Sequence, residues 1–187
     1  DNDTALMLAA IEGQTETVEF LLDRGASVNF VRITGETPLI NSILRCRQPA
    51  VGLLLKKGAN VNYKIRLINT TVDNFTALHF AVRDCSDTAI ATMLLENGAN
   101  INAKGFADTQ PLHITAQYAR IDAMRLLINR GADVNGKTDN SYTALHQGAV
   151  SGSVAMCRLL LDAGVAVDQA TDNNKTALML ASQYGHV

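Results

Sequence analysis

Three histidines are the residues whose type and spacing come closest to a chemical site in this sequence. His79, His113 and His146 follow one another at intervals of 34 and 33 residues. If each belongs to one repeat of a regular stack, their rings lie roughly 8–10 Å apart, the ordinary spacing of packed helices. Because zinc ligands lie about 2 Å from the metal, these histidines cannot share one ion. We expect each histidine to hydrogen-bond backbone between neighbouring repeats, and we predict neither a metal site nor a cofactor.

The three cysteines are the second group with possible chemistry. Cys46 and Cys85 both fall where a glycine ends the first helix in other repeats, so regular stacking would hold their Cα atoms beyond the roughly 7 Å limit for a disulfide. Cys157 occupies a position that is apolar in other repeats, and we expect it in the core. Arg45 and Arg47 flank Cys46 and favour a thiolate there, but a nucleophilic cysteine also needs a positioned base. We therefore expect no catalytic cysteine and a reducing, intracellular setting.

The composition and the remaining motifs argue against most other classes of protein. The net charge of −2 favours neither nucleic acid nor an acidic surface as a target. No apolar run approaches the roughly 20 residues that span a bilayer. No phosphate-binding loop, zinc-protease motif or dinucleotide fingerprint is present. We therefore expect a protein that is not an enzyme, has no membrane span and works in the cytoplasm or nucleus.

A recurring tripeptide divides the chain into repeats. Thr-Ala-Leu or Thr-Pro-Leu occurs five times, and Gln110-Pro111-Leu112 fills the one gap in the series. The first residues of these tripeptides, at positions 4, 37, 76, 110, 143 and 176, are separated by 33, 39, 34, 33 and 33 residues. A glycine followed by Ala or Val lies 21 or 22 residues after each of the first five. Two markers in one phase indicate six repeats, of which the last is partial.

Each repeat predicts two short helices and a turn. The threonine starts the first helix, because its hydroxyl accepts a hydrogen bond from a free backbone N–H group. Small central residues such as Ala81 and Ala149 let neighbouring repeats approach closely, and a glycine ends the helix in several repeats. The second helix carries a leucine pair and ends at the glycine marker. The pairs that follow, as in Val134-Asn135, predict a projecting turn whose asparagine bonds its own turn backbone.

These residues resemble the ankyrin repeat. The 33-residue period and Thr76-Ala77-Leu78-His79-Phe80-Ala81 match that family's pattern, and Thr143-Ala144-Leu145-His146 and Gly131-Ala132-Asp133-Val134-Asn135 match it again. The resemblance implies an all-α fold, an ankyrin-repeat solenoid of stacked helix–loop–helix repeats with projecting β-turn or hairpin loops. We predict one ankyrin repeat domain over residues 1–187, with about five complete repeats, a partial sixth and an inserted loop. Their approximate bounds are 1–33, 34–66 plus the inserted loop 63–71, 72–106, 107–139, 140–172 and 173–187.

The resemblance also implies a non-catalytic module that binds a partner protein, as a peptide or as a folded domain. In ankyrin proteins the usual binding surface is concave and consists of turn tips and first helices. Aromatic and arginine side chains dominate binding hot spots, and they collect at the predicted exposed positions of this surface. Such a surface suits an extended peptide or a partner's helix. We expect a monomer whose partner-binding residues are Arg45, Phe75, Arg83, Phe106, Gln117, Tyr118, Tyr142 and Tyr184.

The interval of 39 places six extra residues between the second and third repeats, in the loop 63–71. Insertions in such stacks map to loops on one face, often the binding face. The insert is either a binding finger or a longer turn that folds back onto its neighbours, and its apolar residues have no obvious core to enter. The candidate contact residues of this finger are Tyr63, Ile65, Arg66, Leu67 and Ile68.

Two other functions stay open. Residues 45–66 hold six basic and no acidic residues, which suits an anionic ligand. Aromatic residues do not interleave with this patch beyond Tyr63, so nucleic acid is the weaker version of that reading. Neither end of the chain shows the polar outer face that is normal for terminal repeats. We therefore expect a fragment of a longer protein, and the alternative role is a regulatory segment of a larger enzyme, channel or effector.

Overall fold

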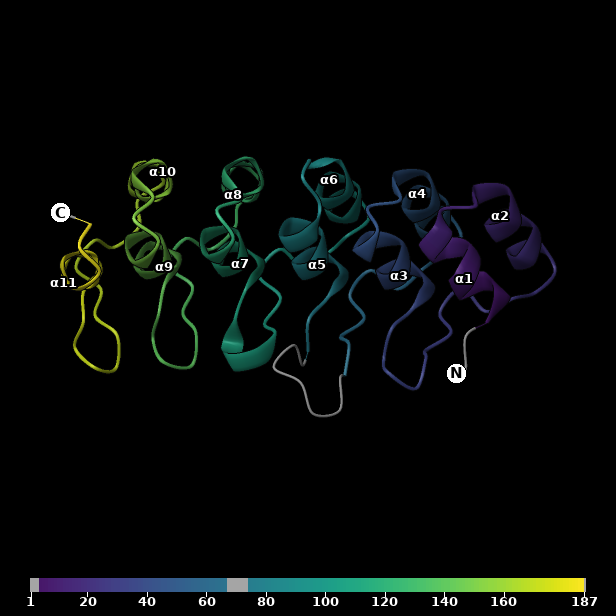
Figure 1. Ribbon diagram of the computed structural model, residues 1–187, viewed down its shortest axis with the longest axis horizontal. Coiled ribbons are helices and arrows are strands. Elements are labelled where there is room, and N and C mark those ends of the chain that lie inside the picture. The colour runs from purple at the N-terminus through teal and green to yellow at the C-terminus, as the bar shows by residue number, and fades with distance from the viewer. Residues whose placement is uncertain (1–3, 67–73, 187) are drawn as a thin grey trace. The chain divides into compact units, whose positions relative to one another are not determined.

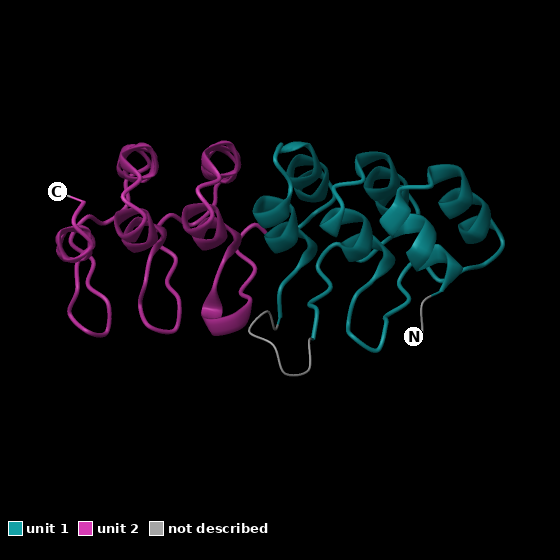
Figure 2. Ribbon diagram, viewed as in Figure 1, with its two compact units in different colours: residues 1–100 teal, residues 101–187 magenta. Residues whose placement is uncertain are grey.

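The computed structural model describes residues 4–66 and 74–186, in which helices are joined by turns (Figure 1). The chain divides into two compact units, Asp1–Asn100 and Ile101–Val187, which we call unit 1 and unit 2 (Figure 2). The described residues include no strand, and none of their helices is long and apolar enough to cross a membrane. Unit 1 holds α1 (Ala5–Glu12), α2 (Thr15–Asp23), α3 (Pro38–Leu44), α4 (Gln48–Lys56), α5 (Ala77–Asp84) and α6 (Ala89–Glu96). Unit 2 holds the 3₁₀ helix η1 (Phe106–Asp108), α7 (Pro111–Gln117), α8 (Ile121–Asn129), α9 (Ala144–Val150), α10 (Val154–Asp162) and α11 (Ala177–Gln183).

Within each unit the helices form two rows. In unit 1 the first helices α1, α3 and α5 pack side by side, and the second helices α2, α4 and α6 lie alongside them (Figure 1). In unit 2 the first row is α7, α9 and α11, and the second is α8 and α10. Both rows contribute to the core, where Leu78, Leu94, Met124 and Leu160 are fully buried. The all-α repeat fold predicted from the sequence is confirmed.

The predicted starts and ends of the helices are also confirmed. Thr4, Thr37 and Thr176 directly precede α1, α3 and α11. The hydroxyl of Thr37 accepts a hydrogen bond from the backbone N–H of Ile40 at 3.3 Å, which satisfies one of the free donors at the helix start. The second helices end at the glycine marker, as α8 does two residues before Gly131. The local sequence therefore determines where each helix begins and stops.

The turn asparagines bond neighbouring repeats, so our prediction that they bond their own turn was wrong. Asn62 donates a side-chain N–H to the carbonyl of Gly98 at 2.9 Å, and its oxygen accepts the N–H of Asn100 at 2.8 Å. Asn135 likewise accepts the N–H of Ala166 at 2.8 Å. Each bonded partner belongs to the turn of the next repeat, where the local sequence around the asparagine does not show it. These side chains therefore tie successive turns together.

Cys46 and Cys85 form a disulfide, so our prediction that they lie too far apart was wrong. Their Cα atoms are 5.6 Å apart, inside the limit for a disulfide. Cys46 follows α3 in the left-handed conformation with φ 50°, as the glycines of other repeats do, whereas Cys85 follows α5 in extended backbone with φ −88°. The extra residue between the helices of repeat three makes room for this different exit. We inferred a reducing setting because we expected the cysteines to stay unpaired. The disulfide removes the basis for that inference.

The base of the inserted loop belongs to the core. Ile65 is buried, its N–H donates to the carbonyl of Phe75, and its own carbonyl accepts the N–H of Asn74, both at 2.8 Å. The two chain segments that lead into and out of the insert are therefore paired here. The expectation that Ile65 has no core to enter was wrong, because this pairing draws it inside.

Candidate functional site

His113 joins the start of its helix to the turn that leads to repeat five. Its Nδ1 accepts the backbone N–H of Gln110 at 3.1 Å, and its Nε2 lies 3.0 Å from the carbonyl oxygen of Gly136 in that turn. Because Nδ1 is an acceptor, the proton of the neutral ring is on Nε2, which donates to that carbonyl. Burial lowers the pKa of His113, against the opposing effect of its backbone hydrogen bonds. The ring is therefore a neutral structural bridge.

The other two predicted histidines hold the same position in their helices. Nδ1 of His146 accepts the N–H of Thr143 at 3.1 Å, and its Nε2 donates to the carbonyl of Lys175 at 3.2 Å. Burial lowers the pKa of His146 as well. Nδ1 of His79 accepts the N–H of Thr76 at 3.1 Å. The predicted bridging between repeats is confirmed for His146, which reaches Lys175 in repeat six. Throughout 4–66 and 74–186, no group of three or more His, Cys, Asp or Glu is placed to hold a metal ion.

Exposed aromatic side chains lie at a turn tip and at two first-helix ends of unit 2. Phe106 begins η1 in the turn before α7 and is 47% exposed. Tyr118 directly follows α7 and is 47% exposed, and Tyr184 follows α11 in the same way and is 54% exposed. Gln117, the last residue of α7, is also exposed. We call Phe106, Gln117, Tyr118 and Tyr184 the tip–helix face of unit 2.

Two predicted aromatic contacts are less accessible than the sequence suggested. Phe75 is only 7% exposed, and its ring stacks on His79 with the centroids 4.6 Å apart. Tyr142 is half-buried, and its ring centroid lies 5.5 Å from that of His146. Both residues directly precede the threonine that starts their helix, and the histidine of that helix offers its ring as a packing surface. The expectation that Phe75 is exposed was therefore wrong.

The two predicted arginines also differ in how far their side chains are exposed to solvent. Arg83 is half-buried, and its Nε and Nη2 bond both carboxylate oxygens of Asp84 at 2.7 and 2.9 Å. Its guanidinium also lies 4.9 Å from the ring centroid of Phe80. Arg45, directly after α3, is exposed. Arg83 is thus held within its own helix, and Arg45 is the arginine that offers its side chain to solvent.

Backbone hydrogen bonds join the turn tips of unit 2 into a row. The N–H of Asp139 donates to the carbonyl of Ala107 at 3.0 Å, and the N–H of Asp172 donates to the carbonyl of Asn140 at 3.3 Å. The hydroxyl of Ser141 also donates to the Asp172 carboxylate at 2.6 Å. In Figure 1 these turns project from the first helices of unit 2 on the side away from α8 and α10. The tips therefore form a continuous edge beside the first helices.

The tip of repeat four has an unusual backbone. Ala107 and Asp108 are both left-handed, with φ 53° and 57°, whereas the tips of repeats five and six each have one such non-glycine residue, Ser141 and Asn174. Residues other than glycine are strained in this region, and such strain is common at binding sites. The strained pair follows Phe106 directly and fixes the path of the chain around that ring.

The predicted contact residues in the inserted loop differ in their exposure to solvent. Arg66 is exposed, Tyr63 is half-buried and Ile65 is buried, so of these three only Arg66 presents its side chain fully to solvent. Leu67 and Ile68 lie outside the described residues. The finger contact therefore stays a prediction, with Ile65 removed from it.

The basic residues of 45–66 do not gather on one surface. They lie at the end of α3, at the end of α4 and in the turn that follows α4. Two of them already have partners, because Nε of Arg47 donates to the carbonyl of Ile11 at 3.2 Å and Nζ of Lys57 pairs with Asp23 at 2.6 Å. This arrangement weakens the case for a cooperative anion site.

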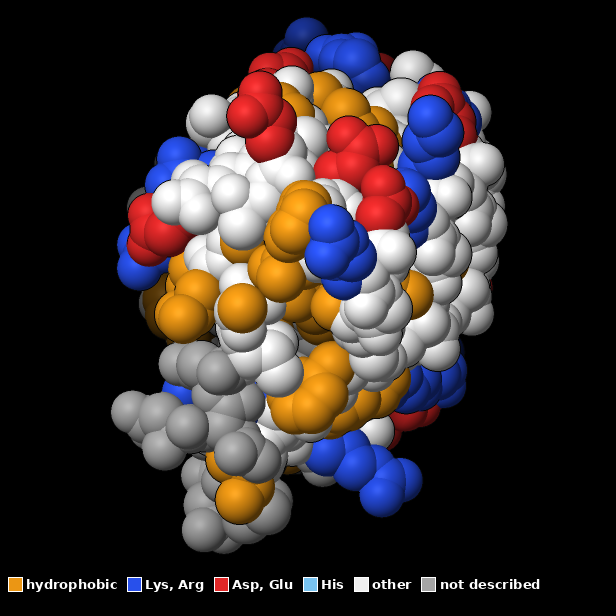
Figure 3. Space-filling model, turned by 90° about the vertical axis from the view of Figure 1, so that its right-hand side faces the viewer, with side chains coloured by type: hydrophobic (Ala, Val, Ile, Leu, Met, Phe, Trp, Pro, Cys, Tyr) orange, Lys and Arg blue, Asp and Glu red, His pale blue; other side chains and the backbone are white. Residues whose placement is uncertain are grey.

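Apolar side chains are also exposed in unit 1. Figure 3 looks onto the end of unit 1 that carries α1 and α2, where hydrophobic side chains lie among acidic and basic ones. Leu8 on α1 is 53% exposed and Phe20 on α2 is 55% exposed. The guanidinium of Arg24 lies 4.7 Å from the ring centroid of Phe20. Phe20 is thus an exposed aromatic residue on a second helix, away from the tip–helix face.

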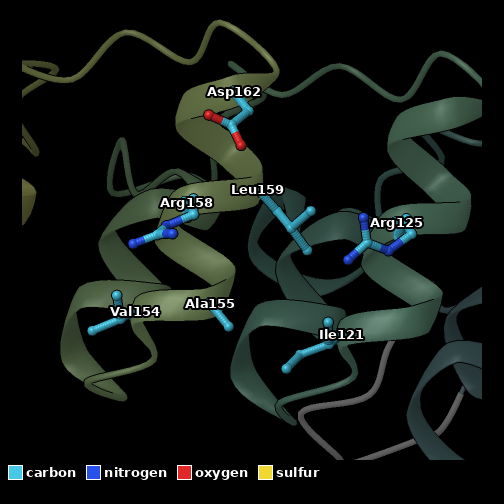
Figure 4. Close-up of a pocket in the computed structure, with 7 residues that line it drawn as sticks. All are labelled: Ile121, Arg125, Val154, Ala155, Arg158, Leu159 and Asp162. Atoms are coloured by element: carbon cyan, nitrogen blue, oxygen red, sulfur yellow. The ribbon is translucent and has the colours of Figure 1, made fainter.

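A groove between α8 and α10, about 440 Å³ in volume, is a feature that the sequence analysis missed (Figure 4). Ile121 and Arg125 of α8 line it on one side, and Ala155 and Leu159 of α10 line it on the other. Such a groove can accept an apolar side chain beside an acidic one. These positions carry no repeat marker. The sequence feature that points to the groove is an apolar residue, Val154, at the start of α10, and the structure leaves it 70% exposed.

Comparison with known families decides what kind of domain this is. A model described as ankyrin repeats (3 copies) matches residues 1–65 and 112–187, and a model of the single ankyrin repeat matches residues 73–106. The chain belongs to the ankyrin-repeat family. Ankyrin repeats in general serve protein–protein interaction, which agrees with a fold whose histidines and turn asparagines hold repeats together.

Individual relatives of this ankyrin chain are longer proteins. An ankyrin repeat protein of fowlpox virus (strain NVSL) is 31% identical over 130 residues, which cover 68% of this chain and 36% of the relative. Human transient receptor potential cation channel subfamily A member 1 is 27% identical over 158 residues, with 67% and 14% covered. The RelA-associated inhibitor of Mus musculus is 33% identical over 108 residues, with 57% and 12% covered. The chain thus spans well under two thirds of the length of these relatives.

Proposed function

We propose that this ankyrin chain is a non-catalytic module that binds a partner protein on the tip–helix face of unit 2. The observation that carries the proposal is the exposure of Phe106, Tyr118 and Tyr184, at 47%, 47% and 54%. One exposed aromatic side chain needs no explanation. Three of them, at a turn tip and at matching first-helix ends, supply the residue types that dominate binding hot spots.

The spacing of the two tyrosines limits the shape of the partner. Tyr118 and Tyr184 stand at equivalent positions two repeats apart, so roughly 16–20 Å separates them at the ordinary spacing of packed helices. An extended peptide covers that length with about six residues at 3.3 Å each. A helix needs about 13 residues at 1.5 Å each. The proposed partner therefore presents an elongated segment with apolar side chains at both ends.

The rigidity of the surrounding elements supports tight binding. The tips are joined through Ala107 and Asn140, His113 joins α7 to the turn that leads to repeat five, and His146 bridges neighbouring repeats. A surface that is ordered before binding loses less conformational entropy when the partner arrives. The proposal assigns no catalysis to this face, since the histidines serve the helix starts and repeat contacts.

The place of the module within a longer protein is a second part of the proposal. One relative is named as a member of a cation channel subfamily and another as an inhibitor associated with RelA, and the matched region is 14% and 12% of their lengths. A regulatory segment that binds a partner within or outside its own chain agrees with both. The location in the cytoplasm or nucleus stays a prediction, which no longer rests on unpaired cysteines. We do not propose an anionic ligand for 45–66, because its basic residues are spread over three places and two are engaged.

The test compares capture of proteins from a cell extract by the wild-type chain and by Phe106→Ala/Tyr118→Ala/Tyr184→Ala. Tyr142 stays unchanged, because its half-buried ring packs near His146. The matched control is Phe20→Ala, which removes an exposed aromatic ring of unit 1. Circular dichroism melts establish that all variants fold.

The proposal predicts a protein that the wild type and Phe20→Ala retain and the triple variant loses. Binding of that protein, once purified, should weaken by at least about 30-fold in the triple variant, equal to about 2 kcal/mol at hot-spot residues. A partner that binds all three forms equally would contradict the proposed face. The groove between α8 and α10 would then be the next surface to test.

A further inference from the structure

The disulfide links two repeats at one edge of unit 1. Cys46 lies two residues after α3, and Cys85 lies directly after α5, so the bond joins the ends of neighbouring first helices. The two cysteines are 39 positions apart in the sequence, and the segment between them includes all of α4 and the inserted loop. Opening the bond would therefore release a constraint between repeats two and three.

The two sulfur-bearing residues differ in their access to solvent. Cys46 is exposed, whereas Cys85 is 4% exposed. An attacking thiolate must approach the sulfur to which it forms its new bond, so access decides which sulfur is attacked and which one leaves. The exposed residues Arg45 and Arg47 flank Cys46 and provide a positive setting that favours an incoming thiolate. Cys46 is thus the side of the bond that is open to attack.

The fold can also accommodate the two free thiols of the reduced state. The sulfur of Cys85 lies 3.5 Å from the carbonyl oxygen of Ile43. A reduced Cys85 thiol can donate its proton to that carbonyl, so the buried side is not left without a partner when the bond opens. Cys46 faces water, which can solvate its thiol. Neither product of reduction requires a rearrangement of the core.

We propose that Cys46–Cys85 is a reversible thiol–disulfide exchange site, with Cys46 as the residue attacked by a small external thiol such as glutathione. The external thiolate forms a bond to the sulfur of Cys46, the disulfide breaks, and Cys85 leaves as a thiolate that takes a proton from water. A second external thiolate then attacks the external sulfur of the mixed disulfide and releases Cys46. Two electrons pass to the protein, and two external thiols become one external disulfide.

The test uses the full 187-residue chain, equilibrated in buffers that range from oxidised to reduced glutathione. After an acid quench, free thiols are blocked with N-ethylmaleimide and each cysteine is read by peptide mass spectrometry. The wild type should gain two reactive thiols together, at Cys46 and Cys85, with a glutathione adduct at Cys46 alone between the two states. Thermal melts of the reduced form should fall by several degrees, because the cross-link no longer constrains the unfolded chain.

Single variants separate the two roles. Cys85→Ser removes the residue that resolves the adduct, so glutathione should accumulate on Cys46. Cys46→Ser leaves only the buried Cys85, which should react at least about tenfold more slowly in the native protein than in denaturant. Cys157→Ser is the control, because that half-buried free cysteine, whose pKa burial raises, takes no part in the bond. Its two-thiol transition should match the wild type.

Two results would overturn the proposal. One is that Cys46 and Cys85 react with maleimide in every glutathione buffer, which would mean that the bond does not form. The other is that the wild-type adduct appears on Cys85 before Cys46, which would reverse the assigned order of attack. Both readings come from the wild-type chain, so they hold even if a variant fails to fold.

Discussion

Units 1 and 2 use the same repeat plan in different ways. In unit 1, Phe75 precedes its helix-starting threonine and is buried against His79. In unit 2, Tyr142 holds the same position but is half-buried. The backbone pairing at the two positions is alike, because the N–H of Ile65 donates to the carbonyl of Phe75 as the N–H of Thr138 donates to that of Tyr142. One repeat position can therefore lie in the core of one repeat and be partly exposed in another, although its backbone hydrogen bonds are the same.

The ends of the first helices show the same contrast. In unit 1, Cys46, two residues after α3, is bonded to Cys85, which directly follows α5. In unit 2 the positions after α7 and α11 hold Tyr118 and Tyr184, which are exposed. At this edge unit 1 thus has a covalent link between repeats. Unit 2 has exposed aromatic side chains there, where we propose that a partner binds.

Two alanine variants test whether buried and exposed aromatic rings differ in their contribution to stability. Phe75→Ala should lower the free energy of unfolding by about 3–5 kcal/mol, because it leaves a cavity in the core. Phe106→Ala, at an exposed tip, should change it by no more than about 0.5 kcal/mol. Urea unfolding followed by circular dichroism measures both. Similar losses in the two variants would show that the rings do not differ in their packing.

The close approach between the insert and repeat two can be tested at glycine. Gly35 has φ 90°, and a Cβ atom there would lie 2.6 Å from the backbone oxygen of Arg66. Gly58 has φ 86° with no atom within 4 Å of such a Cβ, so it is the matched control. Gly35→Ala should cost about 2–3 kcal/mol and Gly58→Ala about 1 kcal/mol, since both strain the backbone but only the first meets another chain segment. Equal costs would argue against contact between the insert and Gly35.

The buried histidines predict a pH dependence of stability. Burial lowers the native pKa of His113 and His146 below the ordinary value of 6.5. As the pH falls below 6.5, the unfolded chain binds protons that the native rings do not, so the unfolded state gains stability. The contribution is therefore complete above pH 6.5 and declines as the pH falls towards the lowered native values.

Urea unfolding midpoints from about pH 7.5 to about pH 5.5 measure this decline. The wild-type midpoint should fall over that interval. In His113→Gln the fall should be smaller, because one of the two titrating groups is missing. A wild-type midpoint that rises towards pH 5.5 would contradict the neutral, buried rings.

The smallest effect is expected for the asparagine links between turns. Asn135→Ala removes the acceptor for the N–H of Ala166 and should cost about 0.5–1 kcal/mol, because the bond is exposed to water. Asn173→Ala, at an exposed turn position of repeat six, is the control and should change stability by less than about 0.5 kcal/mol. If the two variants lose equal stability, the link at Asn135 contributes nothing specific.

Much of the fold could be predicted because its signals are local. A threonine before a helix and a glycine after it act within one turn of backbone, and the histidine bridges follow from one residue type repeated at one position. What could not be predicted depends on contacts between repeats. Cys85 bonds to Cys46 of the neighbouring repeat, and Asn62 and Asn135 bond to the turn of the next repeat. The exposure of Phe106, Tyr118 and Tyr184 agrees with the sequence prediction, because an end of a first helix and a turn tip have no neighbouring element to cover them.

The most direct test of the central claim is hydrogen–deuterium exchange of the full chain, with and without the partner captured by the wild type. If the partner binds the tip–helix face, exchange should slow on binding in 105–109, 117–120, 139–142 and 183–186, which hold the tips and first-helix ends of unit 2. Exchange within α8 and α10 should stay unchanged. Protection confined to α8 and α10, with none at the tips, would contradict the account.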